Sequence, residues 1–457
     1  MELFGTAGIR GDTTSRVTPE LALAVGRAAG LAAVATGDAE FVVGRDGRTT
    51  GEALASAVEA GLLSAGATVR RAGVVPTPTL AFASRGRRGV MLTASHNPPA
   101  DNGLKLFVDG VEYDRSMEEV VESRVEEDAP PVSWDRWGAT EHVAPLPRYR
   151  RAVVSYARGV GGALDGLPVA VDCGNGMGSL GTPGVLRELG ARVVGLNDNV
   201  DGHFPGRESK PTPESLADLR AFVADGDVSL GIGHDGDADR IVVVNADGEV
   251  VHEDTVVAIL ASAYVRAAVA DGIETPVVVT TPNASGRIDE QVAAAGGRVE
   301  RVRLGALHEG IASARAAGGH VAFAAEPWKH VHTAFGGWID GICSAAVVAR
   351  LVAGHDEGLA GLRAPVTERP YRKVSVPCPD AAKRTAMGRL ETDLPEAFPG
   401  ADVDTEHGVR VEFPDASWLL VRPSGTEPYV RIYAESDAVD ALVAEAREVV
   451  ERAVDDA

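Results

Sequence analysis

Residues 89–99 read GVMLTASHNPP, a short apolar run followed by a polar turn. The apolar run predicts a buried β-strand, because a few consecutive apolar residues bounded by turn signals suit a strand that is covered on both faces. Asn97 and the two prolines after it exclude a helix and end the strand in a loop. Ser95 therefore lies where a strand becomes a loop, a common place for a nucleophile or a ligand group in α/β enzymes.

His96 directly follows Ser95, which raises the hypothesis of a Ser–His hydrolase. Neighbouring side chains of an extended chain point to opposite faces, so we expect His96 to be a poor base for Ser95. The alternative for this stretch alone is an Asx-Pro turn without any chemistry. Other stretches have to decide between the two.

The length and composition describe an ordinary globular chain. Its 457 residues suggest roughly three domains, and 45% of them are hydrophobic. No apolar run approaches the length of a membrane span, and the first residues lack the basic and apolar segments of a signal peptide, so we expect a cytoplasmic protein without a membrane partner. The three cysteines, Cys173, Cys343 and Cys378, are too far apart for a disulfide framework or a cysteine zinc site.

The charge balance is strongly acidic. The formal net charge is −22, which argues against nucleic acid and anionic membranes as partners. Only five of the 44 basic residues are lysines. This composition predicts a halophilic protein, because molar salt screens the repulsion between its carboxylates. Where lysine is this scarce, Lys105 and Lys329 become candidates for specific roles.

Strand-like and helix-like segments alternate along most of the chain, which predicts an α/β fold. We expect helices over residues 18–36, 51–64, 149–158, 182–189, 254–270, 340–353 and 440–457, and one that starts at Thr212. We expect strands over residues 41–44, 67–70, 89–92, 167–172, 228–233, 277–280, 298–303, 321–324, 418–421 and 429–433. Residues 241–244 and 250–251 should pair as a hairpin, and residues 102–107 should be a turn that leads into a strand carrying Lys105. The stretch 120–147 shows little periodicity and contains the first domain boundary, near Ala144.

An acidic motif follows the strand expected at residues 228–233. Residues 234–240 read HDGDADR, and Asp235, Asp237 and Asp239 can face one way if this backbone is extended. Carboxylate oxygens suit a hard divalent cation such as Mg²⁺. A calcium EF-hand is excluded, because its twelfth position, counted from Asp235, is Ala246 instead of Glu. The remaining alternative is an acidic surface loop in an acidic protein.

Residues 325–330 read AEPWKH and follow the strand expected at residues 321–324. Glu326 can hydrogen-bond sugar hydroxyls and Trp328 can stack on a sugar ring. A turn with a half-buried tryptophan is the alternative.

Residues 422–428 read RPSGTEP and lie between two expected strands. Arg422, Ser424 and Thr426 can donate hydrogen bonds to a phosphate, Gly425 lets the backbone approach closely, and Arg431 adds charge. A plain hairpin turn is the alternative. The glycine-rich opening, residues 4–11, carries Arg10 and either binds an anion or is a flexible terminal turn.

In this order the stretches resemble the α-D-phosphohexomutase superfamily: the phosphoglucomutases, phosphomannomutases and phosphoglucosamine mutases. Residues 93–99, 235–240 and 422–428 carry the resemblance, and residues 4–11 and 102–107 support it. It implies four domains arranged like a heart around a central cleft. The expected domains are three similar α/β units, at residues 1–145, 146–250 and 251–364, and a smaller, mobile α+β domain at residues 365–457.

The resemblance also implies the chemistry. Ser95 would be phosphorylated at rest, and one Mg²⁺ per chain would bridge that phosphate to Asp235, Asp237 and Asp239. The phosphoryl group would pass to a sugar phosphate and give a hexose bisphosphate, which also serves as activator. The phosphate that does not react would bind at residues 422–426, which contain Arg422, Ser424, Gly425 and Thr426.

Other residues receive roles from the same resemblance. Lys105 and His330 are candidates for proton transfer with the sugar hydroxyls, Arg240 offsets negative charge, and Arg10 holds the phosphoserine region. The sugar loop departs from the usual Gly-Glu-X-Ser-Gly-His, because Ala325, Trp328 and Lys329 stand in place of the first Gly, the Ser and the second Gly. Glu326 and His330 are kept, and Lys329 could reach the substrate phosphate.

The leading hypothesis is therefore a cytoplasmic Mg²⁺-dependent phosphomutase that interconverts the 1- and 6-phosphates of glucose or mannose. Glucosamine phosphate is the alternative substrate. A Mg²⁺-dependent sugar phosphatase that passes the phosphoserine to water is an alternative of another class. A catalytically silent sugar-phosphate sensor would require a broken motif, and the intact serine and aspartates count against it. The oligomeric state stays open.

Overall fold

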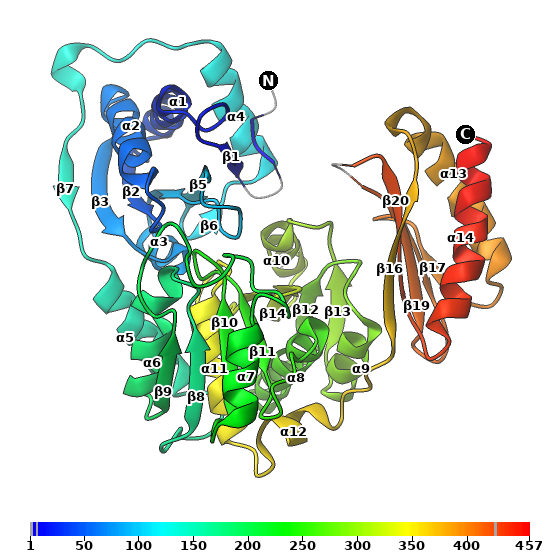
Figure 1. Cartoon of the computed structure of the whole chain (residues 1–457). Coiled ribbons are helices and arrows are strands. Elements are labelled where there is room, and N and C mark those ends of the chain that lie inside the picture. Colours follow the sequence, from blue (N-terminus) through cyan, green and yellow to red (C-terminus); the bar gives the residue numbers. More distant parts are fainter. Residues whose placement is uncertain (1–2, 6–7, 425–426) are drawn as a thin grey trace. The chain divides into compact units, whose positions relative to one another are not determined.

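The computed structural model describes residues 3–5, 8–424 and 427–457. It divides into two compact units, residues 1–253 with 328–363 and residues 254–327 with 364–457. Each unit combines helices with β-sheets (Figure 1), so the α/β fold class is confirmed. Among the described residues, no helix combines the length and the apolar character that crossing a bilayer requires.

The first unit begins with a mixed sheet. Its strands are β1 (Ile9–Asp12), β2 (Glu40–Arg45), β3 (Thr68–Val74), β4 (Arg88–Leu92), β5 (Asp101–Val108), β6 (Val111–Glu112) and β7 (Thr140–His142). They lie in the order β1-β5-β4-β2-β3-β7, with β6 beside β5. Strands β4, β2, β3 and β7 are parallel, while β5 is antiparallel to β4 and β1. The carboxyl ends of β2 and β4 therefore meet at one edge of the sheet.

Four helices accompany this sheet. They are α1 (Pro19–Thr36), α2 (Gly51–Ser64), α3 (Thr77–Ala83) and α4 (Arg115–Glu126). Thr18 caps α1 as expected, because its hydroxyl accepts the backbone N–H of Leu21. Glycine lets α1 and α2 pack backbone to backbone: a Cβ on Gly26 would lie 2.3 Å from the carbonyl oxygen of Val58.

The second sheet of this unit consists of β8 (Pro168–Asp172), β9 (Arg192–Leu196), β10 (Leu230–His234) and β11 (Ile241–Val244), in the order β11-β10-β8-β9. Strands β8, β9 and β10 are parallel, and β11 is antiparallel to β10. The hairpin predicted between residues 241–244 and 250–251 is present as an antiparallel bridge between Val244 and Val250. The same unit contains α5 (Leu146–Ala157), α6 (Thr182–Glu188), α7 (Ala217–Asp225), α11 (Gly341–Ala353), α12 (Gly358–Arg363), β15 (Lys329–Val331) and two 3₁₀ turns, Trp134–Arg136 and Met177–Leu180. The acidic motif begins where β10 ends.

The second unit has two parts. The first consists of parallel strands β13 (Arg298–Arg301), β12 (Val277–Thr280) and β14 (Val321–Glu326), in that order, with α8 (Glu253–Ala270), α9 (Gly286–Ala294) and α10 (Leu307–Ala316). The second is an antiparallel sheet of β16 (Tyr371–Pro377), β20 (Tyr429–Glu435), β19 (Trp418–Pro423), β18 (Val409–Glu412) and β17 (Asp402–Asp404), in that order. Helices α13 (Asp380–Ala397) and α14 (Val439–Asp455) pack against this second sheet through a common apolar core.

Two helix predictions are wrong. The helix expected from Thr212 begins only at Ala217, because the side chains of Thr212 and Ser215 accept each other's backbone N–H groups and hold a turn there. Helix α4 overlaps the stretch that we expected to be irregular. Its apolar residues Met117 and Val121 lie one helical turn apart and pack on the core, and the charged residues around them hid this spacing.

Two loop predictions are also wrong. Arg10 lies in strand β1 opposite Gly103 of β5, although we expected a flexible glycine-rich loop around it. Asn102 and Gly103 belong to β5 and do not form the predicted turn. Pairing between β1 and β5, which are far apart in the sequence, holds both segments extended.

Candidate active site

Ser95 lies just beyond the carboxyl end of β4, as the sequence predicts. Its side chain is fully buried, and its backbone N–H donates to the Thr93 hydroxyl at 2.9 Å. The Ser95 hydroxyl donates to Asp235 Oδ2 at 2.8 Å. The loop that follows β4 of the first sheet and the acidic motif that follows β10 of the second sheet therefore meet at one hydroxyl group.

The geometry expected for His96 is wrong, because its side chain does not point away from that of Ser95. Ser95 has a φ of 52°, in the left-handed region, so the chain is not extended here and His96 Nδ1 lies 3.3 Å from Ser95 Oγ. Burial, followed by the charges of Arg240 and Arg10, lowers the pKa of His96 to about 3, so the ring is neutral. Because the hydroxyl proton points to Asp235, His96 Nδ1 can only donate to Ser95 Oγ and does not serve as its base here.

Arg48 holds the Ser95 loop in place. Its side chain is inaccessible to solvent, and its guanidinium donates to four backbone carbonyl oxygens at 2.5–3.0 Å, those of Ser95, Asn97, Pro98 and Asp101. Four carbonyls on one cation fix the backbone that presents the serine hydroxyl.

Asp46 anchors this arginine. Its Oδ2 accepts from Arg48 Nε at 3.1 Å and from the Thr93 hydroxyl at 2.7 Å. Burial raises the pKa of Asp46, and the Arg48 charge opposes that rise. We did not predict either residue from the sequence. The available signal was their place directly after β2, since Ser95 was found from the same position relative to β4.

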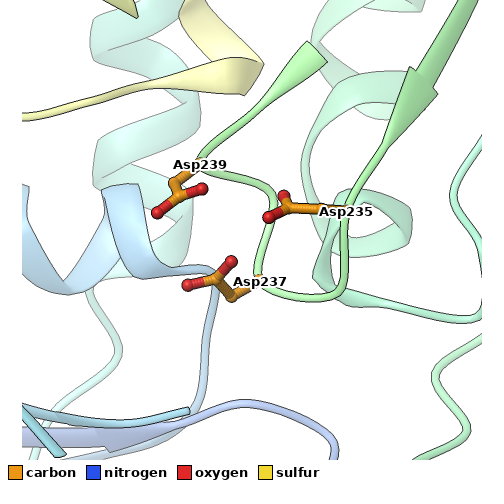
Figure 2. A group of neighbouring side chains, drawn as sticks. All are labelled: Asp235, Asp237 and Asp239. Atoms are coloured by element: carbon orange, nitrogen blue, oxygen red, sulfur yellow. The ribbon is translucent and has the colours of Figure 1, made fainter. Parts of the chain in front are cut away.

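The three aspartates of the acidic motif converge (Figure 2). Each of Asp235, Asp237 and Asp239 offers one carboxylate oxygen within 4.8 Å of the other two, and all three are buried. The backbone that achieves this is a turn, with Ala238 at φ 62°, and not the extended chain that we expected. Alternation along a strand is therefore not what brings these side chains together.

The donor set fits a divalent cation. Among the described residues, Oδ1 of Asp237 and Oδ1 of Asp239 are buried and have no hydrogen-bond partner. Buried carboxylate oxygens without a donor are costly unless a cation binds them. Hard oxygen ligands in a small buried group match the preference of Mg²⁺.

Two cations flank the aspartates. Lys105 Nζ lies 2.8 Å from Asp239 Oδ2 and 3.5 Å from Asp237 Oδ2, and Arg240 Nε lies 3.7 Å from both Asp235 Oδ2 and Asp239 Oδ1. Burial would lower the pKa of Lys105, but the charges of Asp239 and Asp237 hold it above the ordinary value. Lys105 is therefore a fixed positive charge.

The aspartates do not share these charges equally. Burial and the charges of Asp239 and Asp237 raise the pKa of Asp235 well above its ordinary value. Burial acts the same way on Asp239, yet Lys105 and Arg240 hold its pKa below the ordinary value. A divalent cation bound by these carboxylates would lower the pKa of Asp235, because it would add positive charge beside it.

Buried neighbours hold the acidic turn in shape. His234 Nδ1 donates to the carbonyl oxygen of Arg240 at 2.8 Å, which closes the turn, and burial lowers the pKa of His234 to about 4. The Thr77 hydroxyl at the start of α3 donates to Asp237 Oδ2 at 2.6 Å. Thr77 is another contact that the sequence did not indicate, since it lies 160 positions from Asp237.

The sugar-loop candidates divide between the two units. Lys329 and His330 lie in β15 of the first unit, and the backbone of Lys329 forms an isolated antiparallel β-bridge with that of Arg240. Burial lowers the pKa of His330 to about 3, and its Nδ1 lies 3.1 Å from the Ser344 hydroxyl oxygen. Glu326 belongs to the second unit, where it accepts the backbone N–H of Gly305 at 2.6 Å.

Trp328 is half-buried against a core to which β8, α7 and β11 contribute. This position matches the alternative that we gave for residues 325–330, a turn with a half-buried tryptophan.

The predicted phosphate loop joins β19 to β20. Arg422 lies opposite Arg431 across the two strands, and Arg431 also forms an ion pair with Glu427. Gly425 and Thr426 lie outside the described residues. Ser424 is buried, and Lys383 Nζ fixes its backbone by donating to its carbonyl oxygen at 2.6 Å. The sequence analysis did not assign Lys383, although the scarcity of lysines pointed to it as much as to Lys105.

Comparison with known proteins shows the family. Residues 1–131 match α/β/α domain I of phosphoglucomutase/phosphomannomutase, residues 148–248 match its α/β/α domain II, and residues 374–453 match its C-terminal domain. The chain is also 42% identical over 447 residues to a phosphopentomutase of Thermococcus kodakarensis, which covers 95% of this chain and 94% of that protein. The chain belongs to the phosphoglucomutase/phosphomannomutase family.

Other members of the α-D-phosphohexomutase superfamily agree with this assignment. A probable phosphoglucosamine mutase of Methanopyrus kandleri is 40% identical over 462 residues, covering 99% of this chain and 97% of that protein. A phosphoglucomutase/phosphomannomutase family protein of Burkholderia thailandensis has the same fold, with a TM-score of 0.86 and 26% identity over 99% of this chain and 97% of that chain. The resemblance predicted from three motifs is confirmed. This phosphohexomutase-family chain is an enzyme, a phosphotransferase of the isomerase type.

Proposed function

We propose that this phosphomutase interconverts the 6-phosphate and the 1-phosphate of glucosamine through a phosphoserine at Ser95. The hydrogen bond between Ser95 Oγ and Asp235 Oδ2, at 2.8 Å within the buried aspartate cluster, carries the assignment of the nucleophile. The choice of sugar rests on relatives: several of the most similar curated proteins, at 35–40% identity, are named probable phosphoglucosamine mutases. This choice replaces our leading hypothesis of glucose or mannose phosphate.

A pentose phosphate is the second candidate substrate, because the phosphopentomutase of T. kodakarensis shares 42% identity with this chain. The altered sugar loop favours keeping both candidates. Trp328 and Lys329 stand where the superfamily usually carries Ser and Gly, so the contacts to sugar hydroxyls differ from the usual ones.

The aspartate cluster would hold one Mg²⁺ through Asp235, Asp237 and Asp239, together with an oxygen on Ser95. When bound, Mg²⁺ supplies positive charge that offsets the phosphoserine and the three carboxylates. Lys105 and Arg240 contribute fixed positive charges from this chain. Positioning and charge stabilisation account for most of the catalysis in phosphoryl transfer.

Each half-reaction exchanges one P–O bond for another. The bond between phosphorus and Ser95 Oγ breaks as a sugar hydroxyl oxygen bonds to phosphorus, which gives a sugar bisphosphate and restores the free serine. The bisphosphate turns over and returns its other phosphate to Ser95. The proton of the sugar hydroxyl goes to Ser95 Oγ in the first step, and in the second step it goes from Ser95 Oγ to the product hydroxyl. Lys105 and His330 are the proposed relays for this proton; Lys105 is protonated at rest, so it gives up one proton as it takes the next. A trace of sugar bisphosphate would act as activator by rephosphorylating Ser95.

Substrate contacts are proposed at two loops and one strand. The phosphate that does not react would bind at residues 422–426, with Arg422, Ser424, Gly425 and Thr426 as donors and Arg431 nearby. Glu326 would accept from sugar hydroxyls, and Lys329 would approach the substrate phosphate. Arg10 would hold the phosphoserine region, which agrees with its charge lowering the pKa of His96.

The test is ³¹P NMR of the protein with Mg²⁺ in molar potassium chloride. Glucosamine, ribose, glucose and mannose 1-phosphates are supplied separately, each with a trace of the matching bisphosphate. Fastest growth of glucosamine 6-phosphate supports the proposal, while faster growth of ribose 5-phosphate supports the second candidate. Growth of inorganic phosphate alone would show a phosphatase. Ser95→Ala should abolish turnover and leave sugar-phosphate binding intact; full activity in this variant would refute the nucleophile.

We also propose domain boundaries after residues 145, 250 and 364, and a cytoplasm of high salt as the setting. The boundaries predict that limited proteolysis cuts near these residues first. The salt proposal rests on the net charge of −22, and it predicts that the folded fraction, followed by circular dichroism, falls when salt is dialysed away.

A further inference from the structure

A cavity lined by arginines lies in the first unit, beside the carboxyl end of α3. Its volume is about 370 Å³, and β2, β3, α3, the turn after α3 and residues 143–148 contribute to its walls. Four of the lining residues are Arg70, Arg85, Arg87 and Arg148. Four guanidinium groups in one cavity need a physical reason in a chain whose net charge is −22.

Two of these arginines already have partners. Arg70 Nε lies 2.9 Å from Glu40 Oε1 and 3.0 Å from Glu141 Oε1. Arg87 also forms an ion pair with Glu40, and it donates to the carbonyl oxygen of Ala83 at the end of α3. Ion pairing and helix capping account for Arg70 and Arg87 without any ligand.

The other two arginines lack such a partner. Within the part of the chain that the structure describes, neither Arg85 nor Arg148 forms an ion pair. Arg85 Nε donates to the carbonyl oxygen of Phe82, and its guanidinium stacks on the Phe82 ring with 3.9 Å to the centroid. The guanidinium of Arg148 lies 5.8 Å from the same centroid.

Stacking on a ring engages the face of a guanidinium and leaves most of its N–H edges free. Both side chains are exposed to solvent, and the two guanidinium groups lie 3.9 and 5.8 Å from the Phe82 ring centroid, so they face the same part of the cavity. Partial burial and the charge of Arg148 lower the pKa of Arg85, and the charge of Asp109 opposes this. An anion placed between the two guanidinium groups would offset their like charges and accept their free N–H groups. Two guanidinium forks suit two phosphoryl groups better than a single one.

The rest of the cavity wall is apolar. Its exposed apolar surface comes from Ala83, Val143, Ala144 and Pro145, while the other two apolar lining residues, Val42 and Phe82, are almost fully buried. Its volume falls in the range of small-molecule sites, roughly 300–1,000 Å³. An inorganic anion would leave this apolar wall uncovered.

We propose that this cavity binds a small organic molecule that carries a diphosphate group. The diphosphate would pair with Arg85 and Arg148, and the organic part would cover the apolar wall. This site is separate from the one built around Ser95, and it does not depend on which sugar phosphate the enzyme isomerises.

The test is isothermal titration calorimetry of the full-length enzyme in molar potassium glutamate, with ADP and inorganic pyrophosphate as probes. We expect one ADP per chain at this cavity, and at least tenfold weaker binding to the double variant Arg85→Ala/Arg148→Ala. We expect pyrophosphate to bind less tightly than ADP, because it lacks the organic part. The double variant Arg85→Lys/Arg148→Lys should show an intermediate loss, since it keeps the charge without the planar fork.

A matched control removes the same charge elsewhere. Arg389→Ala/Arg447→Ala takes two half-exposed arginines from α13 and α14 of the second unit and should leave ADP binding unchanged. Phosphomutase activity of the alanine double variant at Arg85 and Arg148 should stay within twofold of wild type; if that variant fails to fold, the lysine variant carries the comparison.

Four outcomes would overturn the proposal. The first is an absence of ADP binding to the wild-type enzyme, and the second is equal affinity in the wild type and the alanine double variant. The third is an affinity for ADP no greater than that for pyrophosphate, which would mean that the apolar wall contributes nothing. If potassium chloride at the same molarity as the glutamate abolishes ADP binding, the cavity is a chloride site only, and that result also refutes the proposal.

Discussion

Replacing Arg48 tests whether the backbone of the Ser95 loop is what makes this serine reactive. Arg48→Met keeps much of the side-chain volume but removes every donor. It leaves four buried carbonyl oxygens and the carboxylate of Asp46 without their cation. Removing one member of a buried ion pair costs roughly 3–5 kcal/mol in the free energy of unfolding. We expect a loss of this size, measured by urea denaturation.

Arg48→Lys separates positioning from stability. Lysine keeps the charge next to Asp46, but a single ammonium cannot reach four carbonyl groups and the carboxylate together. A displacement of the reacting group by about 1 Å costs about 100-fold in rate. We therefore expect the kcat of Arg48→Lys to fall by about 100-fold, while the KM for the sugar phosphate changes little, because Arg48 does not contact the substrate.

The assay measures kcat and KM together with the fraction of phosphoserine, read by intact-protein mass spectrometry. Arg45→Lys is the matched control on the same segment. Its ion pair with Glu52 is partly exposed, so we expect a stability change of less than about 1 kcal/mol and unchanged kcat. Wild-type kcat in Arg48→Lys would refute the argument that these hydrogen bonds position Ser95.

Three further predictions follow from other buried charges. Glu435→Gln leaves the guanidinium of Arg287, which is 1% exposed, without its carboxylate, so the free energy of unfolding should fall by roughly 3–5 kcal/mol in urea denaturation. The control Glu451→Gln, in an exposed pair with Arg447, should lower it by less than about 1 kcal/mol, and equal losses in the two variants would contradict the prediction. Burial raises the pKa of Asp340 to about 6, so the folded protein holds the Asp340 proton more tightly than the unfolded chain does. The free energy of unfolding should therefore fall as the pH rises from 3.8, the ordinary pKa of this carboxyl, to about 6. Asp340→Asn should reduce the slope of this pH dependence by up to roughly 1.4 kcal/mol per pH unit. Identical pH profiles of unfolding in the variant and the wild type would refute this prediction. We expect millimolar Mg²⁺ to raise the Tm of the wild type, and Asp237→Asn should remove that rise and weaken Mg²⁺ binding at least tenfold in calorimetry; an equal rise in the variant would exclude Asp237 as a ligand.

Much of the fold was predictable because local rules and the global fold agree along most of the chain. The apolar runs at residues 89–92 and 277–280 became buried strands, and Thr18 caps the helix that it was expected to cap. The failures have three different physical causes. At Thr212, side-chain hydrogen bonds hold a turn. In α4, charged residues hid the helical spacing of the apolar residues, and at Asn102 pairing with the distant strand β1 keeps the chain extended.

The sequence by itself determined which residues are candidates for the site. Ser95, the three aspartates of residues 235–239, and Lys105 were named from residue type and spacing, because a nucleophile at a strand end and closely spaced carboxylates are visible in one dimension. The same motifs predicted the family, which the comparisons confirm.

Only the tertiary structure decided how these groups meet. Ser95 and Asp235 are 140 positions apart and share a hydrogen bond, while Arg48 lies 47 positions before the serine that it holds. The left-handed backbone of Ser95 turns His96 toward the hydroxyl, contrary to the alternation of an extended chain. Such contacts depend on which strands are neighbours and on burial, which lowers the dielectric constant and makes each partner essential. A local sequence pattern predicts neither which strands are neighbours nor how deeply a side chain is buried.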